Sequence, residues 1–94
     1  MSEALNPKVY VAVKVEFNES GIMLPREITW EDGTRYEIDR VVDIRQAAAM
    51  KAGGQGDRYT IMVHGKQSYL FFERSTNLTG NNIGRWFVER RHAN

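Results

Sequence analysis

The chain has 94 residues, of which 13 are Lys or Arg and 12 are Asp or Glu, so its formal net charge is +1 at pH 7. A charge this small does not by itself indicate nucleic acid or an anionic membrane as a partner. The absence of cysteine excludes disulfides, thiolate metal sites and a cysteine nucleophile. The length predicts a single domain over residues 1–94, with residues 1–7 and 91–94 as loose tails. Because the sequence has no signal pattern and no apolar run of membrane-spanning length, we expect a cytoplasmic protein without a membrane partner.

The first predicted element is a half-buried strand over residues 8–17. Apolar side chains occupy its odd positions and point to one face: Val9, Val11, Val13, Val15 and Phe17. A turn cluster at residues 18–21 follows. Pro25 is expected near the start of the next strand, where its missing N–H group costs least.

The Asp-Gly pair at residues 32–33 predicts a hairpin, and the neighbouring side chains decide the length of its loop. A two-residue loop would divide the apolar side chains between both faces of the sheet. A three-residue loop over residues 31–33 instead gathers four of them on one face: Trp30, Ile28, Tyr36 and Ile38. We therefore predict a type I turn with Gly33 as a left-handed G1 bulge, and we expect Trp30 in the core.

A strand over residues 34–42 is expected next, followed by one short helix near residues 44–52. Asp43 is a typical capping residue, Gln46 stands three positions later, and Gly53 follows the last expected helical position. A helix of about two turns does not form alone in water, so it must pack against the sheet.

The second predicted hairpin has a type II′ turn at residues 65–66, which would place Ile61 opposite Leu70 and Tyr59 opposite Phe72. A polar loop over residues 74–83 and a last strand from residue 84 complete the chain. The predicted fold class is all-β: a small antiparallel meander barrel or half-barrel of about six strands with the one short helix.

The last strand carries the main candidate binding surface, which consists of Arg85, Trp86, Arg90 and Arg91. Small barrels stack single-stranded bases on aromatic rings that lie beside basic residues. Neighbouring residues of a strand face opposite ways, so either Trp86 or Phe87 is expected in the core.

Two weaker candidate sites lie elsewhere in the chain. Tyr36, Asp39 and Arg40 would form a small-ligand site if a concave pocket holds them. Lys51 and Arg58 flank a glycine-rich segment and could contact an anion. However, these glycines follow the expected helix instead of preceding it, and the carboxyl end of a helix does not attract anions.

The sequence assigns no catalytic residue, metal ligand or cofactor. His64 falls at a hairpin end and His92 in the tail, and neither belongs to a motif with ligand spacing. The carboxylates between residues 31 and 43 are expected to serve as turn, capping or solvent-facing groups.

Three segments resemble a set of short uncharacterised bacterial proteins: WEDGTRYEIDRVVDIRQAAAMKAGGQGDRY, then YLFFE, then GRWFVER. The shared pattern is approximately W-x-D-G-x-x-Y-x-I-D-x-V, A-G-G-x-G-x-R-Y and G-R-W, and it covers about residues 9–90. The resemblance implies a stand-alone cytoplasmic domain of unknown function, and it supplies no catalytic residues. The loop at residues 74–83 looks longer than the pattern expects.

The sequence favours a non-enzymatic module that binds a protein partner or associates with itself. Its abundant aromatic residues and its lack of a catalytic constellation lead to this hypothesis. The alternative is a small barrel that binds single-stranded nucleic acid through the last strand, and the second alternative is a small-ligand binder. A basic face around the last strand would favour nucleic acid, whereas a face of mixed charge would favour a protein partner.

Overall fold

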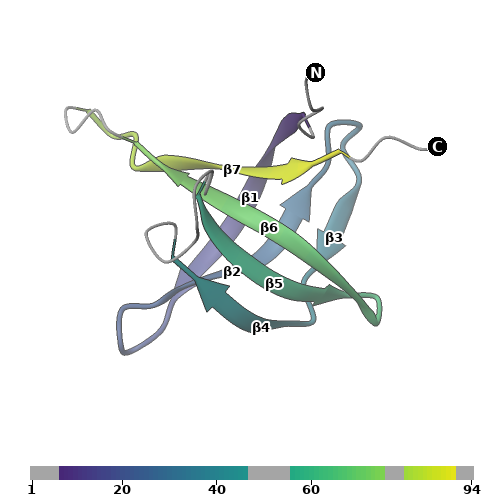
Figure 1. Cartoon of the computed structure of the whole chain (residues 1–94), viewed down its shortest axis with the longest axis horizontal. Coiled ribbons are helices and arrows are strands. Elements are labelled where there is room, and N and C mark those ends of the chain that lie inside the picture. Colours follow the sequence, from purple (N-terminus) through teal and green to yellow (C-terminus); the bar gives the residue numbers. More distant parts are fainter. Residues whose placement is uncertain (1–6, 47–55, 76–79, 91–94) are drawn as a thin grey trace, which may run out of the picture.

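The computed structural model describes residues 7–46, 56–75 and 80–90, in which all regular elements are antiparallel strands (Figure 1). These strands are β1 (Lys8–Phe17), β2 (Met23–Thr29), β3 (Arg35–Glu37), β4 (Arg40–Arg45), β5 (Asp57–Val63), β6 (Lys66–Arg74) and β7 (Gly84–Glu89). They form one curled sheet in the order β3-β2-β1-β7-β6-β5-β4. The prediction of an all-β half-barrel is confirmed, with seven strands instead of six.

The seventh strand arises because the expected strand over residues 34–42 bends and changes partner. β3 pairs with β2, and β4 pairs with β5 at the other edge of the sheet. Only Ile38 and Asp39 connect them. The Ile38 amide donates to the Arg26 carbonyl at 2.9 Å, and the Asp39 amide donates to the Met62 carbonyl at 2.8 Å. This joint ties both outer edges of the sheet together, which closes one side of the half-barrel.

The core lies on the inner face of the curled sheet. Its buried side chains come from both halves of the chain: Ile28, Ile38, Tyr59, Ile61, Leu70, Phe72 and Trp86. Burial of these apolar groups is the main driving force for the curl, because a flat sheet of this size would leave them in water.

The hairpin between β2 and β3 has the predicted three-residue loop. The Trp30 amide donates to the Thr34 carbonyl at 2.7 Å, and the Gly33 amide donates to the Trp30 carbonyl at 2.9 Å. Gly33 has a φ of +90°, whereas Asp32 does not have a positive φ. Ile28 pairs with Tyr36 as expected. The expectation that Trp30 lies in the core is only partly met, because Trp30 is half-buried and Tyr36 is exposed, and both line the rim of the half-barrel.

The predicted register of the second hairpin is wrong. Val63 pairs with Lys66, so the loop consists of His64 and Gly65, and Ile61 lies opposite Ser68. His64 has a φ of +53° and Gly65 a φ of +76°, as a type I′ turn requires. Type I′ turns match the right-handed twist of paired strands, which explains why a non-glycine residue accepts a left-handed conformation here.

The predicted helix near residues 44–52 is wrong at its start. Ile44 and Arg45 belong to β4, and Asp43 pairs with Thr60 of β5 instead of capping a helix. The β-branched residues before them favour an extended strand against β5. Residues 47–55, which include the rest of this expected helix, lie outside the described residues, as do 1–6, 76–79 and 91–94. Within the described residues, no helix is long and apolar enough to cross a membrane.

Candidate binding face

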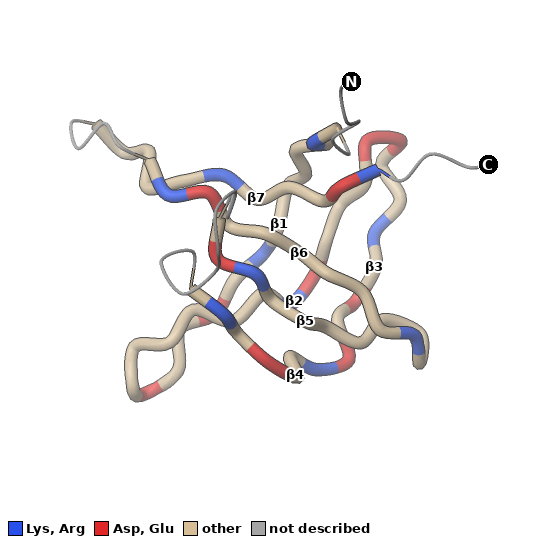
Figure 2. Tube along the Cα trace, viewed as in Figure 1, with Lys and Arg blue, Asp and Glu red and all other residues tan. Residues whose placement is uncertain are grey.

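A row of side chains crosses five strands on the outer face of the sheet. Tyr10 pairs with Phe87, Phe87 pairs with Phe71, Phe71 pairs with Arg58, and Arg58 pairs with Arg45. Because residues that pair across strands point to the same face, the row runs from three aromatic rings to two guanidinium groups. Figure 2 shows that Lys and Arg positions are interspersed with Asp and Glu positions over the sheet.

The three rings form an outer aromatic cluster, which consists of Tyr10, Phe71 and Phe87. Phe71 and Phe87 stack with centroids 5.0 Å apart, and Tyr10 meets Phe87 edge-on at 5.8 Å. Lys8 places its Nζ 4.8 Å from the centroid of the Phe87 ring. Phe87 is therefore 0% exposed although it lies on the outer face of the sheet. The outer face has a small apolar cluster of its own, separate from the inner core.

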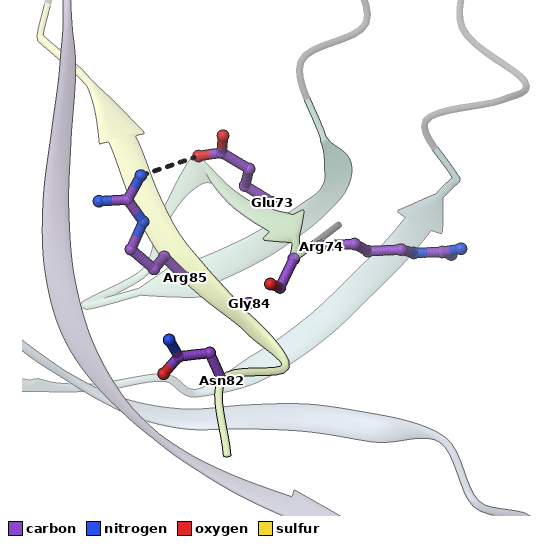
Figure 3. Close-up of a pocket in the computed structure, with 6 residues that line it drawn as sticks. Glu73, Arg74, Asn82, Gly84 and Arg85 are labelled. Carbon is purple, nitrogen blue, oxygen red and sulfur yellow. Dashed lines mark ion pairs between the residues drawn. The ribbon is translucent and has the colours of Figure 1, made fainter. Parts of the chain in front are cut away.

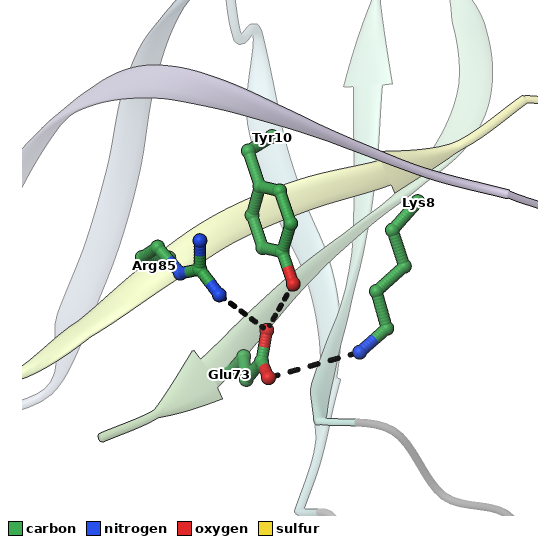
Figure 4. A network of polar contacts seen from close by, with 4 residues as sticks. All are labelled: Lys8, Tyr10, Glu73 and Arg85. Carbon is green, nitrogen blue, oxygen red and sulfur yellow. Dashed lines mark hydrogen bonds and ion pairs between the residues drawn. The ribbon is translucent and has the colours of Figure 1, made fainter.

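A network of polar contacts covers one side of this cluster and centres on Glu73 (Figure 4). The Tyr10 hydroxyl donates to Glu73 Oε1 at 2.7 Å. The ion pairs of Glu73 with Lys8 and Arg85 measure 3.7 Å and 4.0 Å. The Arg85 guanidinium also lies 3.8 Å from the centroid of the Tyr10 ring. Three strands thus hold Lys8, Tyr10, Glu73 and Arg85 in one arrangement, which we call the Glu73 network.

The Glu73 network shifts the pKa values of two of its members in opposite directions. The hydrogen bond from Tyr10 lowers the pKa of the Glu73 carboxyl, and the nearby charges of Lys8 and Arg85 lower it further. The same hydrogen bond raises the pKa of the Tyr10 hydroxyl, with added contributions from desolvation and from the Glu73 charge. At neutral pH the network therefore holds an ionised carboxylate and a neutral phenol.

A polar pocket of about 320 Å³ adjoins the network where β6 and β7 meet the loop between them (Figure 3). It is lined by Glu73, Arg74, Ser75, Asn82, Gly84 and Arg85. The Arg74 side chain extends away from the Glu73–Arg85 pair and reaches the buried Asp57, with its Nε 3.1 Å from Asp57 Oδ2. The pocket offers hydrogen-bonding and ion-pairing groups to a ligand.

The described residues do not bring together a catalytic or metal-binding constellation. No group of three or more His, Asp or Glu side chains converges within them. His64 lies at a turn, where its ring meets Tyr36 edge-on at 6.2 Å. His92 lies outside the described range. The described outer face offers groups for ion pairing, hydrogen bonding and aromatic packing.

The four residues expected on the last strand do not form one surface. Arg85 joins the Glu73 network on the outer face, whereas Trp86 points inward and is 7% exposed. Arg90 forms an ion pair with Glu31 from the loop between β2 and β3. Arg91 lies outside the described residues. The sequence predicts that either Trp86 or Phe87 lies in the core. Both rings are buried, Trp86 in the inner core and Phe87 in the outer aromatic cluster.

The weaker set of Tyr36, Asp39 and Arg40 does not share a pocket. Asp39 borders a polar hollow beside β2, and Tyr36 lines an apolar hollow at the rim. Asp39 accepts a hydrogen bond from the Gly65 amide at 3.3 Å, which connects the second hairpin to the joint between β3 and β4. Arg40 is exposed at the start of β4. The three side chains therefore do not converge on one site.

Of the proposed anion contacts, Lys51 lies outside the described residues and Arg58 lies in the outer row. The Arg58 guanidinium covers the Tyr69 ring at 4.7 Å, and its Nε is buried without a hydrogen-bond partner. Arg45, directly opposite Arg58, pairs with Asp43 at 3.1 Å. Two cations therefore face each other across β4 and β5, and the Asp43 carboxylate is paired with one of them, Arg45.

Sequence reasoning missed Lys8, Tyr10 and Glu73 as members of the candidate face. The alternation in residues 8–17 does place Tyr10 away from the core face, which is the available signal. The alternation does not predict which strand lies beside β1. In the structure β1 pairs with β7, and this pairing brings Tyr10 to Arg85 and Glu73. No protein family, curated protein or solved structure matches the chain. Its function is therefore inferred from these contacts.

Proposed function

We propose that this protein is a non-enzymatic interaction module that binds a protein partner through the outer aromatic cluster and the Glu73 network. The observation that carries this proposal is a pair of exposed tyrosines whose rings each lie against an arginine guanidinium group. Tyr10 is 40% exposed under Arg85, and Tyr69 is 38% exposed under Arg58. Tyrosine and arginine are enriched among the residues that dominate protein interfaces, and rigid rings lose little entropy on binding.

The charge distribution supports a protein partner. Glu73 lies between Lys8 and Arg85, and Glu89 and Asp43 lie near the same outer row. A face of mixed sign can pair with both cations and anions of a protein surface, whereas a phosphate backbone requires a basic one. The geometry of the rings supports the same conclusion, because a guanidinium group already covers one face of the Tyr10 ring and one face of the Tyr69 ring, which leaves less ring surface for a base to stack on.

Single-stranded nucleic acid is the second candidate ligand, favoured by one observation. Arg45 and Arg58 face each other beside the exposed Tyr69, and the Arg58 Nε has no hydrogen-bond partner among the described residues. This candidate predicts that a fluorescent single-stranded oligonucleotide binds at low salt and dissociates as salt rises. Binding must also be lost in an Arg58→Ala variant. If no binding is detected at low salt, this second candidate is excluded.

A comparison of matched variants tests the main proposal. The purified chain is used to capture partners from lysate and is then compared with the double variant Tyr10→Ala plus Arg85→Ala. We expect capture of the same partner to fall about ten-fold or more, since truncation of an interface hot spot to alanine costs about 2 kcal/mol or more. Arg26→Ala is the matched control, because Arg26 is also an exposed arginine paired with a glutamate, Glu16, but lies away from the cluster.

The same variants distinguish a protein partner from self-association. Sedimentation of the chain over a range of concentrations measures its oligomeric state. A dimer that dissociates in the double variant but not in Arg26→Ala would identify a second copy as the partner. Equal capture and equal sedimentation of all three proteins would refute the outer face as the interface.

A further inference from the structure

The strands β6 and β7 are paired over only part of their lengths. Their register runs from Arg74↔Gly84 to Phe71↔Phe87 and is not continued toward the second hairpin. Beyond this point β6 remains paired with β5, and β7 remains paired with β1. Figure 1 shows the two strands diverging toward the β5–β6 hairpin. Within the described residues, 67–70 of β6 and 88–89 of β7 therefore have no strand paired with them on the side that faces the gap.

The gap between these strands opens on the inner face into an apolar hollow of about 280 Å³. Its apolar walls include Ile28, Trp30, Tyr36, Ile61 and Val63. This hollow explains why Trp30 is only half-buried, because its ring stands at the rim instead of being enclosed.

The same gap opens on the outer face into a second hollow of about 270 Å³, next to the outer aromatic cluster. Gln67, Phe71 and Glu89 border it. Both hollows share Ser68, Tyr69 and Val88, so they lie on the two sides of one opening in the sheet. Glu89 makes no ion pair within the described part of the chain, which leaves its carboxylate available to a cation.

We propose that an extended segment of the partner protein binds in this opening as an added strand along the free side of β6. The proposal rests on the proposed function, since it states how part of the partner is held. Side chains of an extended segment alternate between faces, and the two hollows lie on opposite faces. An apolar side chain then enters the inner hollow, and its neighbour, a Lys or Arg, reaches Glu89 on the outer side.

Two physical reasons favour a strand over a small apolar molecule. An extended peptide supplies hydrogen-bond partners to backbone groups of residues 67–69 that face the gap, and a hydrocarbon does not. A small molecule in the inner hollow would also leave the outer hollow and Glu89 unused. The preferred segment therefore has the pattern apolar–cationic–apolar.

The test uses an isotope-labelled sample of the chain and a synthetic peptide with alternating Val and Lys residues as the probe. NMR titration should shift the amide signals of residues 67–70 and 88–89. Methylation of the peptide backbone nitrogens leaves the peptide side chains unchanged and removes the peptide N–H groups that would donate to β6. We expect this methylation to weaken binding about ten-fold. Glu89→Gln should weaken binding by about two- to five-fold, as for an exposed ion pair.

The outcomes separate this proposal from the proposed function. Peptide shifts confined to the rings of Trp30 and Tyr36, with no effect of backbone methylation, would show an apolar pocket and overturn strand addition. Absence of peptide binding, together with partner capture that still depends on Arg85, would overturn strand addition and leave the outer face as the interface. Peptide binding in the opening with capture unaffected by Arg85→Ala would support the added strand and contradict the proposed face.

Discussion

Glu73 shows how one residue organises contacts from three strands. Arg85 lies opposite it on β7, and Lys8 and Tyr10 reach it from β1. A carboxylate on the outer face of a sheet would ordinarily be solvated and mobile. Here a hydrogen bond and two flanking cations fix it, and it in turn fixes the Tyr10 ring against Phe87.

The Tyr10 hydroxyl provides a direct test of this network. Because its hydrogen bond is the largest cause of the lowered pKa of Glu73, Tyr10→Phe should raise that pKa toward the ordinary glutamate value. A carboxyl group whose folded-state pKa is lowered stabilises the protein above its unfolded-state pKa, and this stability is lost as the pH falls through the folded-state value. In Tyr10→Phe the free energy of unfolding should therefore decrease less as the pH falls through the acid range.

NMR titration of the Glu73 carboxyl carbon, with urea unfolding across the acid range, measures both effects. Tyr69→Phe is the matched control, because it removes a hydroxyl from the same outer face without touching Glu73. Equal Glu73 titration curves in Tyr10→Phe and in the unaltered chain would contradict the network.

Alanine substitutions at two glycines with positive φ should reduce the free energy of unfolding by different amounts, because the surroundings of the two glycines differ. Gly33 has open space around the position of a Cβ atom, so Gly33→Ala costs only the left-handed backbone, about 1–2 kcal/mol. At Gly84, with a φ of +156°, a Cβ would lie 2.6 Å from the Glu73 carbonyl oxygen and would also meet the Phe72 ring. Gly84→Ala should add about 1–3 kcal/mol of overpacking to the backbone strain. Urea unfolding compares the two variants, and a larger loss in Gly33→Ala would contradict this order.

At the scale of whole elements, the two hairpins show which features are predictable from the sequence. The loop at residues 31–33 is predictable because a slip by one residue would turn Ile28 and Tyr36 to opposite faces. The second hairpin differs from its prediction by two residues, and such a slip keeps every side chain on its face. Both faces of β5 and β6 carry apolar groups, so burial does not choose the register. The left-handed conformation of His64 fixes the register, and the spacing of apolar residues does not predict that conformation.

The second hairpin should therefore be sensitive to the residue at position 64. A β-branched residue is strongly disfavoured at a φ of +53°, so His64→Val should destabilise the fold by about 1–2 kcal/mol. Asn is favoured in type I′ turns, and His64→Asn should be close to neutral, since it gains turn preference and loses the ring contact with Tyr36. Thermal unfolding measures both variants. Equal stability of His64→Val and His64→Asn would refute the type I′ assignment.

At the scale of the whole molecule, the pairing of β1 with β7 decides where the candidate face lies. The hydrogen bond between Tyr10 and Glu73 joins residues 63 positions apart. Local patterns identify Arg85 as a surface residue, but its partners follow only from the strand order. The same holds for Trp86, which alternation alone leaves free to face either way and which the curl of the sheet places in the core. The fold class is thus predictable from local patterns, whereas most of the site depends on non-local pairing.

The joint at residues 38–39 should be critical for the closed shape of the half-barrel. Ile38 is 4% exposed in the core, and its backbone and that of Asp39 bind β2 and β5. Ile38→Ala should therefore cost about 2–4 kcal/mol, as for other large-to-small changes in a core. Ile83→Ala removes the same atoms from a side chain that is 66% exposed, and it should change stability by less than about 0.5 kcal/mol.

Hydrogen exchange adds a readout that a simple loss of core packing would not give. If the joint holds the two edges together, Ile38→Ala should speed exchange of the Ile38 and Asp39 amides more than that of amides between β6 and β7, where Phe71 pairs with Phe87. Exchange that accelerates equally at both places would mean that the variant unfolds globally and that the joint has no separate role in closure. Selective exchange at the joint, with the Glu73 network unchanged, would show that the two edges can part while the binding face stays assembled.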